Sequence, residues 1–150
     1  MPMTQERIEA RSRHARRKQS NRYRELFEAA NEMILVHESS GQLLDANEKT
    51  CQRLGYSRAE LLRKNYVDIQ SPRYAPLFTQ RLFELSRQGV AVHESAYVRR
   101  DGAVIPVQTS CRSFSYGGRP AILCIARDSM KNNHLSTAAL LTKVREALKT

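Results

Sequence analysis

The apolar and polar positions along the chain predict two groups of strands that flank a helical middle. Short apolar runs at residues 33–37 and 42–45 predict two strands, and runs within residues 90–127 predict three more joined by glycine turns. Between them, residues 48–88 show helical spacing. Strands from both sides of the helical block must share one sheet to bury their apolar faces. The pattern therefore predicts an α+β fold, a five-stranded antiparallel sheet with short helices packed on one face.

The stretch from Gly41 to Leu62 is dense in helix-capping signals. Asn47 is placed to cap the first turn of a helix, and Gly55 stands where a left-handed C-cap would end it. Ser57 and Glu60 then have the spacing of a capping box. Helices this short are not stable alone, so we expect them to pack on the sheet.

The two ends of the chain are also predicted to contain helices. Residues 1–22 are basic and offer little apolar surface, so they form either a solvated helix or a disordered segment. An apolar face at helical spacing begins at Tyr23, which predicts a helix on the domain from near Asn21. Residues 131–150 are interpreted as a linker and an amphipathic C-terminal helix. The main domain is expected to span residues 23–130.

The formal net charge is +10, and most of it lies near the N-terminus. Residues 1–24 hold eight Lys or Arg against two Glu, which leaves only +4 for the rest of the chain. Such a segment can bind nucleic acid or another anionic surface through its cations. No aromatic residue precedes Tyr23 in the basic run, so base stacking is not supported. Binding of this kind stays an alternative to a merely solvated segment.

Composition and cysteine usage favour a cytoplasmic globular protein. Hydrophobic residues make up 41% and charged residues 27% of the chain, and no apolar run is long enough to span a bilayer. The N-terminus has no apolar core behind its positive charges, so it does not resemble a secretory signal. Cys51, Cys111 and Cys124 are widely spaced, which favours reduced, mostly buried thiols over a disulfide framework or zinc site.

Three motifs together resemble the PAS domain family over about residues 23–130. Asp45-Ala46-Asn47, followed by Leu54-Gly55-Tyr56-Ser57 and Glu60-Leu61, resembles the signature between the second strand and the second helix of that family. Arg99-Arg100-Asp101-Gly102 resembles its hairpin before the fourth strand, and Arg127-Asp128 resembles the exit from the fifth strand. Ser129 and Met130 depart from the usual pair at that exit.

The resemblance implies a sensory and protein-interaction module of a bacterial-type signal-transduction system. Family members commonly precede a histidine kinase of a two-component system, a cyclic-dinucleotide enzyme or a transcription regulator. The resemblance also implies a homodimer formed through the helix before the first strand. The candidate dimer-interface residues on that helix are Tyr23, Leu26, Phe27 and Ala30.

No cofactor is predicted from the residues that would hold one. Flavin photosensors of this family form an adduct with a cysteine, and Tyr66 stands at that position here, although Asn65 and Gln70 of the motif are kept. Haem-binding members use a histidine on the long helix, and residues 74–88 contain none. Flavin-adduct chemistry and haem are therefore not expected, while an unknown small molecule remains possible.

Neither catalysis nor metal binding is indicated by the sequence. The chain has no nucleophile elbow, phosphate-binding loop, dinucleotide fingerprint or zinc-protease motif, so we do not expect an enzyme. His37 and His93 lie on predicted strands, where a structural role is favoured over ligation.

A pocket between sheet and helices is the candidate ligand site. Two interpretations of its inward-facing residues stay open: they line a ligand site, or they simply fill the core of a stand-alone partner or scaffold domain. The candidate residues come from the helices and from the fourth and fifth strands: Tyr66, Ile69, Phe78, Leu82, Ile105, Val107, Thr109, Ile122 and Cys124.

Overall fold

A computed structural model describes residues 4–129 and 137–149 of the chain. Its elements, in chain order, are α1 (Gln5–Ala29), β1 (Met33–His37), β2 (Leu43–Ala46), α2 (Glu48–Leu54), α3 (Arg58–Leu61), α4 (Tyr66–Ile69), the 3-10 turn η1 (Ala75–Leu77), α5 (Phe78–Gln88), β3 (Val90–Val98), β4 (Val104–Tyr116), β5 (Arg119–Asp128) and α6 (Thr137–Lys149).

The five strands form one antiparallel sheet in the order β2-β1-β5-β4-β3. The predicted α+β fold is confirmed, and each expected strand lies within two residues of its position in the structure. β5 is central, as its apolar run suggested, and pairs with β1 on one side and β4 on the other. Strands from the two ends of the domain therefore meet at the middle of the sheet.

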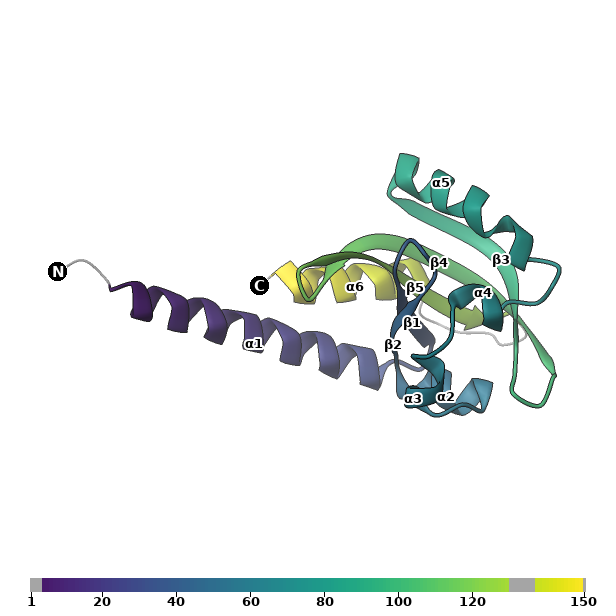
Figure 1. Ribbon diagram of the computed structural model, residues 1–150, viewed down its shortest axis with the longest axis horizontal. Coiled ribbons are helices and arrows are strands. Elements are labelled where there is room, and N and C mark those ends of the chain that lie inside the picture. Colours follow the sequence, from purple (N-terminus) through teal and green to yellow (C-terminus); the bar gives the residue numbers. More distant parts are fainter. Residues whose placement is uncertain (1–3, 130–136, 150) are drawn as a thin grey trace.

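Alternating side chains on β1 and β5 divide the core into two layers. Met33 and Leu35 point to the inner face, where the short helices α2 to α5 cover the sheet, while Ile34 and Val36 point to the outer face. On the outer face, the end of α1 and the whole of α6 lie side by side (Figure 1). The expectation of helices on one face is thus incomplete, because the terminal helices cover the other.

α1 is one continuous helix that starts much earlier than predicted. It runs from Gln5, with Thr4 as its N-cap, and not from near Asn21. Its first half extends away from the domain, and the side chains of residues 4–14 are exposed (Figure 1). From Gln5 on, the structure shows the helical one of the two alternatives for the basic segment. The predicted linker at 131–136 and the motif residue Met130 lie outside the described residues.

The capping signals were interpreted correctly, but Asn47 does more than cap. Its side chain accepts a hydrogen bond from the Thr50 N–H at 3.0 Å and also from the Ile34 N–H at 3.0 Å. Its amide nitrogen donates to the carbonyl oxygens of Phe27 and Glu32, each at 2.9 Å. One buried side chain thereby joins α1, β1 and α2.

One hairpin turn differs from the expectation. An Asp-Gly pair between two strands predicts a two-residue turn with positive φ at both positions, but here only Gly102 has it, at 89°. The Gly102 N–H instead bonds the Arg99 carbonyl, and the Arg99 N–H bonds the carbonyl of Ala103. The residues before Gly102 have negative φ, and the loop ends at a glycine with positive φ. This arrangement is common in hairpin loops longer than two residues.

Candidate functional site

A small pocket lies between the inner face of the sheet and helices α4 and α5. Its volume is about 30 Å³, which is room for about one water-sized molecule. Six of the nine predicted ligand-site residues line it: Tyr66, Phe78, Leu82, Thr109, Ile122 and Cys124. Ile69, Ile105 and Val107 are instead buried in the surrounding core.

Several polar lining residues were missed by sequence reasoning. His37, Gln70, Arg81 and His93 all line the pocket. The strand period gives a signal for His37, because Met33 and Leu35 of the same strand also face inward. The sequence offered no comparable signal for Gln70, whose place follows from the turn after α4.

An aromatic wall closes one side of the pocket. Tyr66 stacks on His37 with ring centroids 4.6 Å apart, and its hydroxyl lies 2.7 Å from the hydroxyl of Tyr97. Burial raises the pKa of both tyrosines well above 10, so both hydroxyls remain neutral hydrogen-bonding groups. Asn65 starts α4 with a capping box to Asp68, which fixes the direction of the Tyr66 side chain.

From His37 the pocket lining continues to two thiols. His37 Nδ1 lies 2.7 Å from the Glu38 carbonyl oxygen, and because a carbonyl only accepts, Nδ1 carries the proton. Burial lowers the pKa of His37, so the ring is neutral and its Nε2 offers a lone pair. That Nε2 faces the sulfur of Cys124 at 3.5 Å, and the sulfurs of Cys124 and Cys111 are 2.7 Å apart.

Two polar atoms at the pocket have no hydrogen-bond partner in the described structure. They are Oε1 of Gln70, a residue that is only 6% exposed, and Nε2 of His93. The Glu84 carboxylate lies 3.5 Å from His93 Nε2 but without hydrogen-bond geometry. Burial and the neighbouring Arg81 lower the pKa of His93, which keeps its ring neutral. Buried polar groups without partners are uncommon, so these atoms mark a place where a ligand or water can bind.

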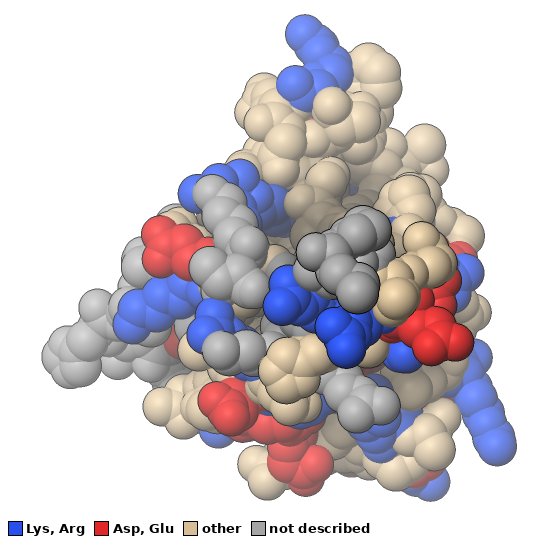
Figure 2. Space-filling model, turned by 90° about the vertical axis from the view of Figure 1, so that its left-hand side faces the viewer, with Lys and Arg blue, Asp and Glu red and all other residues tan. Residues whose placement is uncertain are grey.

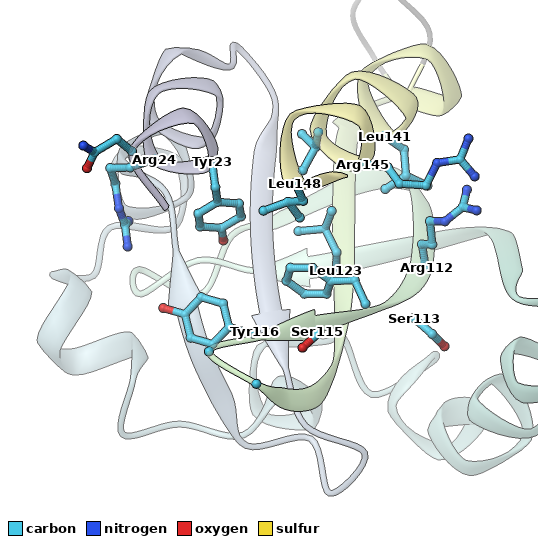
Figure 3. A pocket seen from close by; sticks show the side chains of 15 residues that line it. Tyr23, Arg24, Arg112, Ser113, Ser115, Tyr116, Leu123, Leu141, Arg145 and Leu148 are labelled. Atoms are coloured by element: carbon cyan, nitrogen blue, oxygen red, sulfur yellow. The ribbon is translucent and has the colours of Figure 1, made fainter. Parts of the chain in front are cut away.

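A second, larger cavity lies on the outer face of the sheet. This outer groove has a volume of about 900 Å³ and runs between α1, α6 and the β4–β5 hairpin (Figure 3). Leu123, Leu141 and Leu148 supply apolar walls, and Arg112 and Arg145 lie together at one end (Figure 3). No sequence pattern indicates this groove, because it depends on how the two terminal helices pack.

A buried carboxylate fixes the other end of the outer groove. Asp45 is fully buried and accepts from Arg58 at 2.6 Å, from Arg24 at 3.0 Å and from the Tyr116 hydroxyl at 2.9 Å. This cluster connects α1, β2, α3 and β4. Burial and the Asp45 charge also raise the pKa of Tyr23, so its phenol stays neutral.

The four candidate dimer-interface residues fall into two groups. Tyr23 and Phe27 are 6% and 1% exposed and pack inside this chain against the outer face of the sheet. Leu26 and Ala30 are only partly buried at the edge of the same cluster. The burial of Tyr23 and Phe27 therefore needs no second chain, and dimerisation stays a prediction that concerns Leu26 and Ala30.

Charge on the N-terminal side of the molecule is mixed. Figure 2 shows Lys and Arg side chains interspersed with Asp and Glu on the face from which α1 projects. Within α1, Gln5 bonds Glu9 and Arg24 pairs with Glu28, both across one helical turn. Among the described residues, this face therefore carries charges of both signs.

No three His, Cys, Asp or Glu side chains in residues 4–129 and 137–149 are arranged to hold a metal ion. None of the helices in that part of the chain combines the length and apolar character that crossing a membrane requires.

Comparison with known proteins agrees with this architecture. A family model described as PAS domain matches residues 31–129. The methyl sulfide methyltransferase-associated sensor of Methanosarcina acetivorans is 29% identical over 136 residues, which are 89% of this chain and only 14% of that protein. The chain thus spans a small part of this curated relative.

Solved structures show the same fold. The PAS domain of an HTR-like protein from Haloarcula marismortui has 28% identity and a TM-score of 0.66, covering 83% of this chain and 99% of that one. A domain of a sensory box sensor histidine kinase/response regulator from Geobacter sulfurreducens has 29% identity and a TM-score of 0.62, covering 73% and 94%. Because the family model spans more than half of the chain, the chain belongs to the PAS domain family, the sensor domains of signalling proteins.

Proposed function

We propose that this chain is a non-enzymatic sensory module that binds a small polar ligand in the inner pocket and passes the signal to an output protein. The observation that carries the proposal is the pair of polar atoms without partners, Gln70 Oε1 and His93 Nε2, in the lining of one pocket. A core whose residues only fill space would be expected to satisfy such groups.

The pocket also limits what the ligand can be. At about 30 Å³ it is an order of magnitude smaller than the roughly 300–1,000 Å³ of sites for drug-sized molecules, so we propose a ligand of a few heavy atoms and not flavin or haem. Gln70 Oε1 is an acceptor and requires a donor from the ligand. Phe78 and Leu82 are partly buried members of the core cluster, so movement of α5 offers a way to enlarge the site.

A route for the signal leads from the pocket to the terminal helices. Cys124 and Ile122 of β5 line the pocket, while Leu123 and Ile125 of the same strand pack against α1 and α6. A ligand that moves β5 would therefore shift the helices through direct contacts. We propose that these helices carry the signal through a homodimer to an output domain or partner.

Ligand binding is tested by NMR titration of the full chain with acetamide, a small donor and acceptor. We expect the amide signals of residues around Gln70 and Thr109 to shift, and the shifts to be lost in Gln70→Leu. The matched control Gln88→Leu changes an exposed residue at the end of α5 and should leave the shifts in place. Equal shifts in wild type and Gln70→Leu would remove the basis for this site.

A further inference from the structure

Cys111 and Cys124 lie directly opposite each other on the paired strands β4 and β5. Their sulfur atoms are 2.7 Å apart, only slightly farther than the roughly 2.05 Å of a disulfide bond. The register, and not a flexible loop, holds them there, because residues on both sides of the pair continue the same ladder. Two thiols from different strands are thus kept within reach of each other.

We infer that Cys111 and Cys124 form a redox-active dithiol in the wall of the inner pocket, which hydrogen peroxide oxidises to an intramolecular disulfide. Both residues line the pocket, and hydrogen peroxide, with two heavy atoms, is only slightly larger than the water-sized molecule for which the pocket has room. This inference goes beyond the proposed function, because it needs no ligand bound at Gln70.

The reaction can be written from the groups that are present. Cys111 is partly exposed and attacks one oxygen of peroxide as the thiolate, giving a sulfenic acid and hydroxide. The buried Cys124 sulfur then attacks the sulfenic sulfur, forming the disulfide and expelling the second oxygen as water. The water of this second step carries the sulfenic oxygen, and the hydroxide of the first step becomes the other water by taking up the proton that Cys111 released. In total, two thiols lose two hydrogens and peroxide is reduced to two water molecules.

His37 provides a base for the second step. Its Nε2 lone pair faces the Cys124 sulfur at 3.5 Å, because its other nitrogen is committed to the Glu38 carbonyl. It can take the Cys124 proton as the sulfur attacks and return it to the leaving hydroxide. Without this neighbour the thiol would be a weak nucleophile, since burial raises the pKa of Cys124 well above 9.

The backbone accommodates the bond without rearrangement of the sheet. Directly opposed residues of an antiparallel pair have Cα atoms about 4.5 or about 5.5 Å apart. Both distances lie within the range of roughly 4.4–6.8 Å found for disulfides. The oxidised form would therefore retain the fold, while the Cys124 thiol hydrogen that faces His37 would be lost.

The test is thiol counting by intact-mass spectrometry on the full chain. The reduced protein is treated with peroxide, denatured and alkylated. We expect wild type to lose two hydrogens and to leave one of its three thiols free for alkylation. After trypsin cleavage at Arg112, the peptides that contain Cys111 and Cys124 should remain joined until a reductant is added.

Matched variants make the result specific. Cys51→Ser should form the disulfide as wild type does, whereas Cys111→Ser and Cys124→Ser should not, with circular dichroism confirming that each variant is folded. Gln88→Leu, at the exposed end of α5 and outside the pocket lining, should also form it. Three alkylatable thiols in oxidised wild type, a disulfide between two chains, or oxidation of one cysteine to sulfinic acid alone would overturn the inference.

Discussion

The side-chain amide of Asn47 donates to the carbonyl oxygen of Phe27 at 2.9 Å, across a sequence separation of twenty residues. Phe27 lies near the end of α1, and Asn47 begins α2 on the other side of the sheet edge. This amide is buried and also donates to the carbonyl oxygen of Glu32, so it fixes how the N-terminal helix joins the domain. Asn47 therefore caps α2 and also holds the end of α1 in place.

Replacement of Asn47 by Asp should therefore destabilise the domain strongly. Asp caps a helix as well as Asn, but it cannot donate to Phe27 and Glu32, and it introduces a buried charge. We expect the free energy of unfolding in urea to fall by about 3–5 kcal/mol. Asn65→Asp is the control, because Asn65 caps α4 with one exposed donor bond to Ser40 and should cost about 1 kcal/mol or less. Equal losses in both variants would contradict the role assigned to Asn47.

The hydroxyl pair of Tyr66 and Tyr97 should show energetic coupling. Tyr97→Phe removes the partner that lies 2.7 Å from a buried hydroxyl, which should cost about 1–3 kcal/mol. The double variant with Tyr66→Phe should cost less than the sum of the single ones, by about 1 kcal/mol in a denaturation cycle. Tyr56 is the control, because its ring is partly exposed and the Lys64 ammonium lies over it. Tyr56→Phe should change stability by no more than about 0.5 kcal/mol. Strict additivity would show that the two hydroxyls do not interact.

Stability should fall as the pH drops below the ordinary histidine pKa of 6.5. Burial lowers the pKa of His37 in the folded chain, so below pH 6.5 the unfolded chain binds a proton that the folded chain does not. The slope that His37 contributes therefore fades as the pH rises above 6.5, and it is at most about 1.4 kcal/mol per pH unit below that value. His93 acts in the same direction.

Urea midpoints between about pH 5 and about pH 7.5 measure this slope. His37→Gln should flatten it whatever its effect on absolute stability, and His93→Gln should flatten it further. His14→Gln changes an exposed residue of α1 and should leave the slope unchanged. If the wild-type slope remains in both His37→Gln and His93→Gln, it would have to come from carboxyl groups.

Dimerisation should depend on Leu26 and not on its buried neighbour Phe27. We expect a wild-type mass of twice 17.2 kDa at high concentration by light scattering. Leu26→Glu should shift it to the monomer at a stability cost of about 1 kcal/mol. Phe27→Ala should instead lower stability by about 3–5 kcal/mol, because it empties a site in the core of this chain. A monomeric wild type, or a dimer unchanged by Leu26→Glu, would count against the proposed interface.

The basic helix should not bind nucleic acid measurably. Between Glu9 and Glu25 the chain has seven Lys or Arg and no acid, but no aromatic residue precedes Tyr23 in this run, so phosphate contacts alone, without base stacking, would have to hold a complex. We expect no anisotropy change with a labelled DNA duplex at low salt. Binding that disappears when residues 1–20 are removed would instead support the alternative function.

Local chemistry was predictable from the sequence, and packing between distant segments was not. Asn47, Gly55 and Ser57 act on neighbouring backbone, so their spacing alone identified the caps that the structure shows. The prediction of a two-residue turn at Asp101-Gly102 was wrong, because the turn type depends on the loop length, and the loop length depends on strand register. We did not predict that α6 covers the outer face, because the apolar face of an amphipathic helix does not identify the surface against which it packs.

The candidate site divides in the same way. Tyr66 and Thr109 follow from the period of their elements, whereas Gln70 enters the pocket through a turn with no periodic pattern. The pairing of Cys111 with Cys124 depends on a register that two hairpins set jointly. Cysteines that looked unrelated along the chain are therefore neighbours in space.

Side chains alternate between the two faces of β5, so only this one strand separates the inner pocket from the terminal helices. Cys124 faces the pocket, and the residues on either side of it face α1 and α6. In the proposed function no hinge or long lever is needed, because Leu123 and Ile125, on either side of Cys124, already contact the terminal helices. At the centre of the sheet, only β5 separates the proposed ligand pocket from those helices.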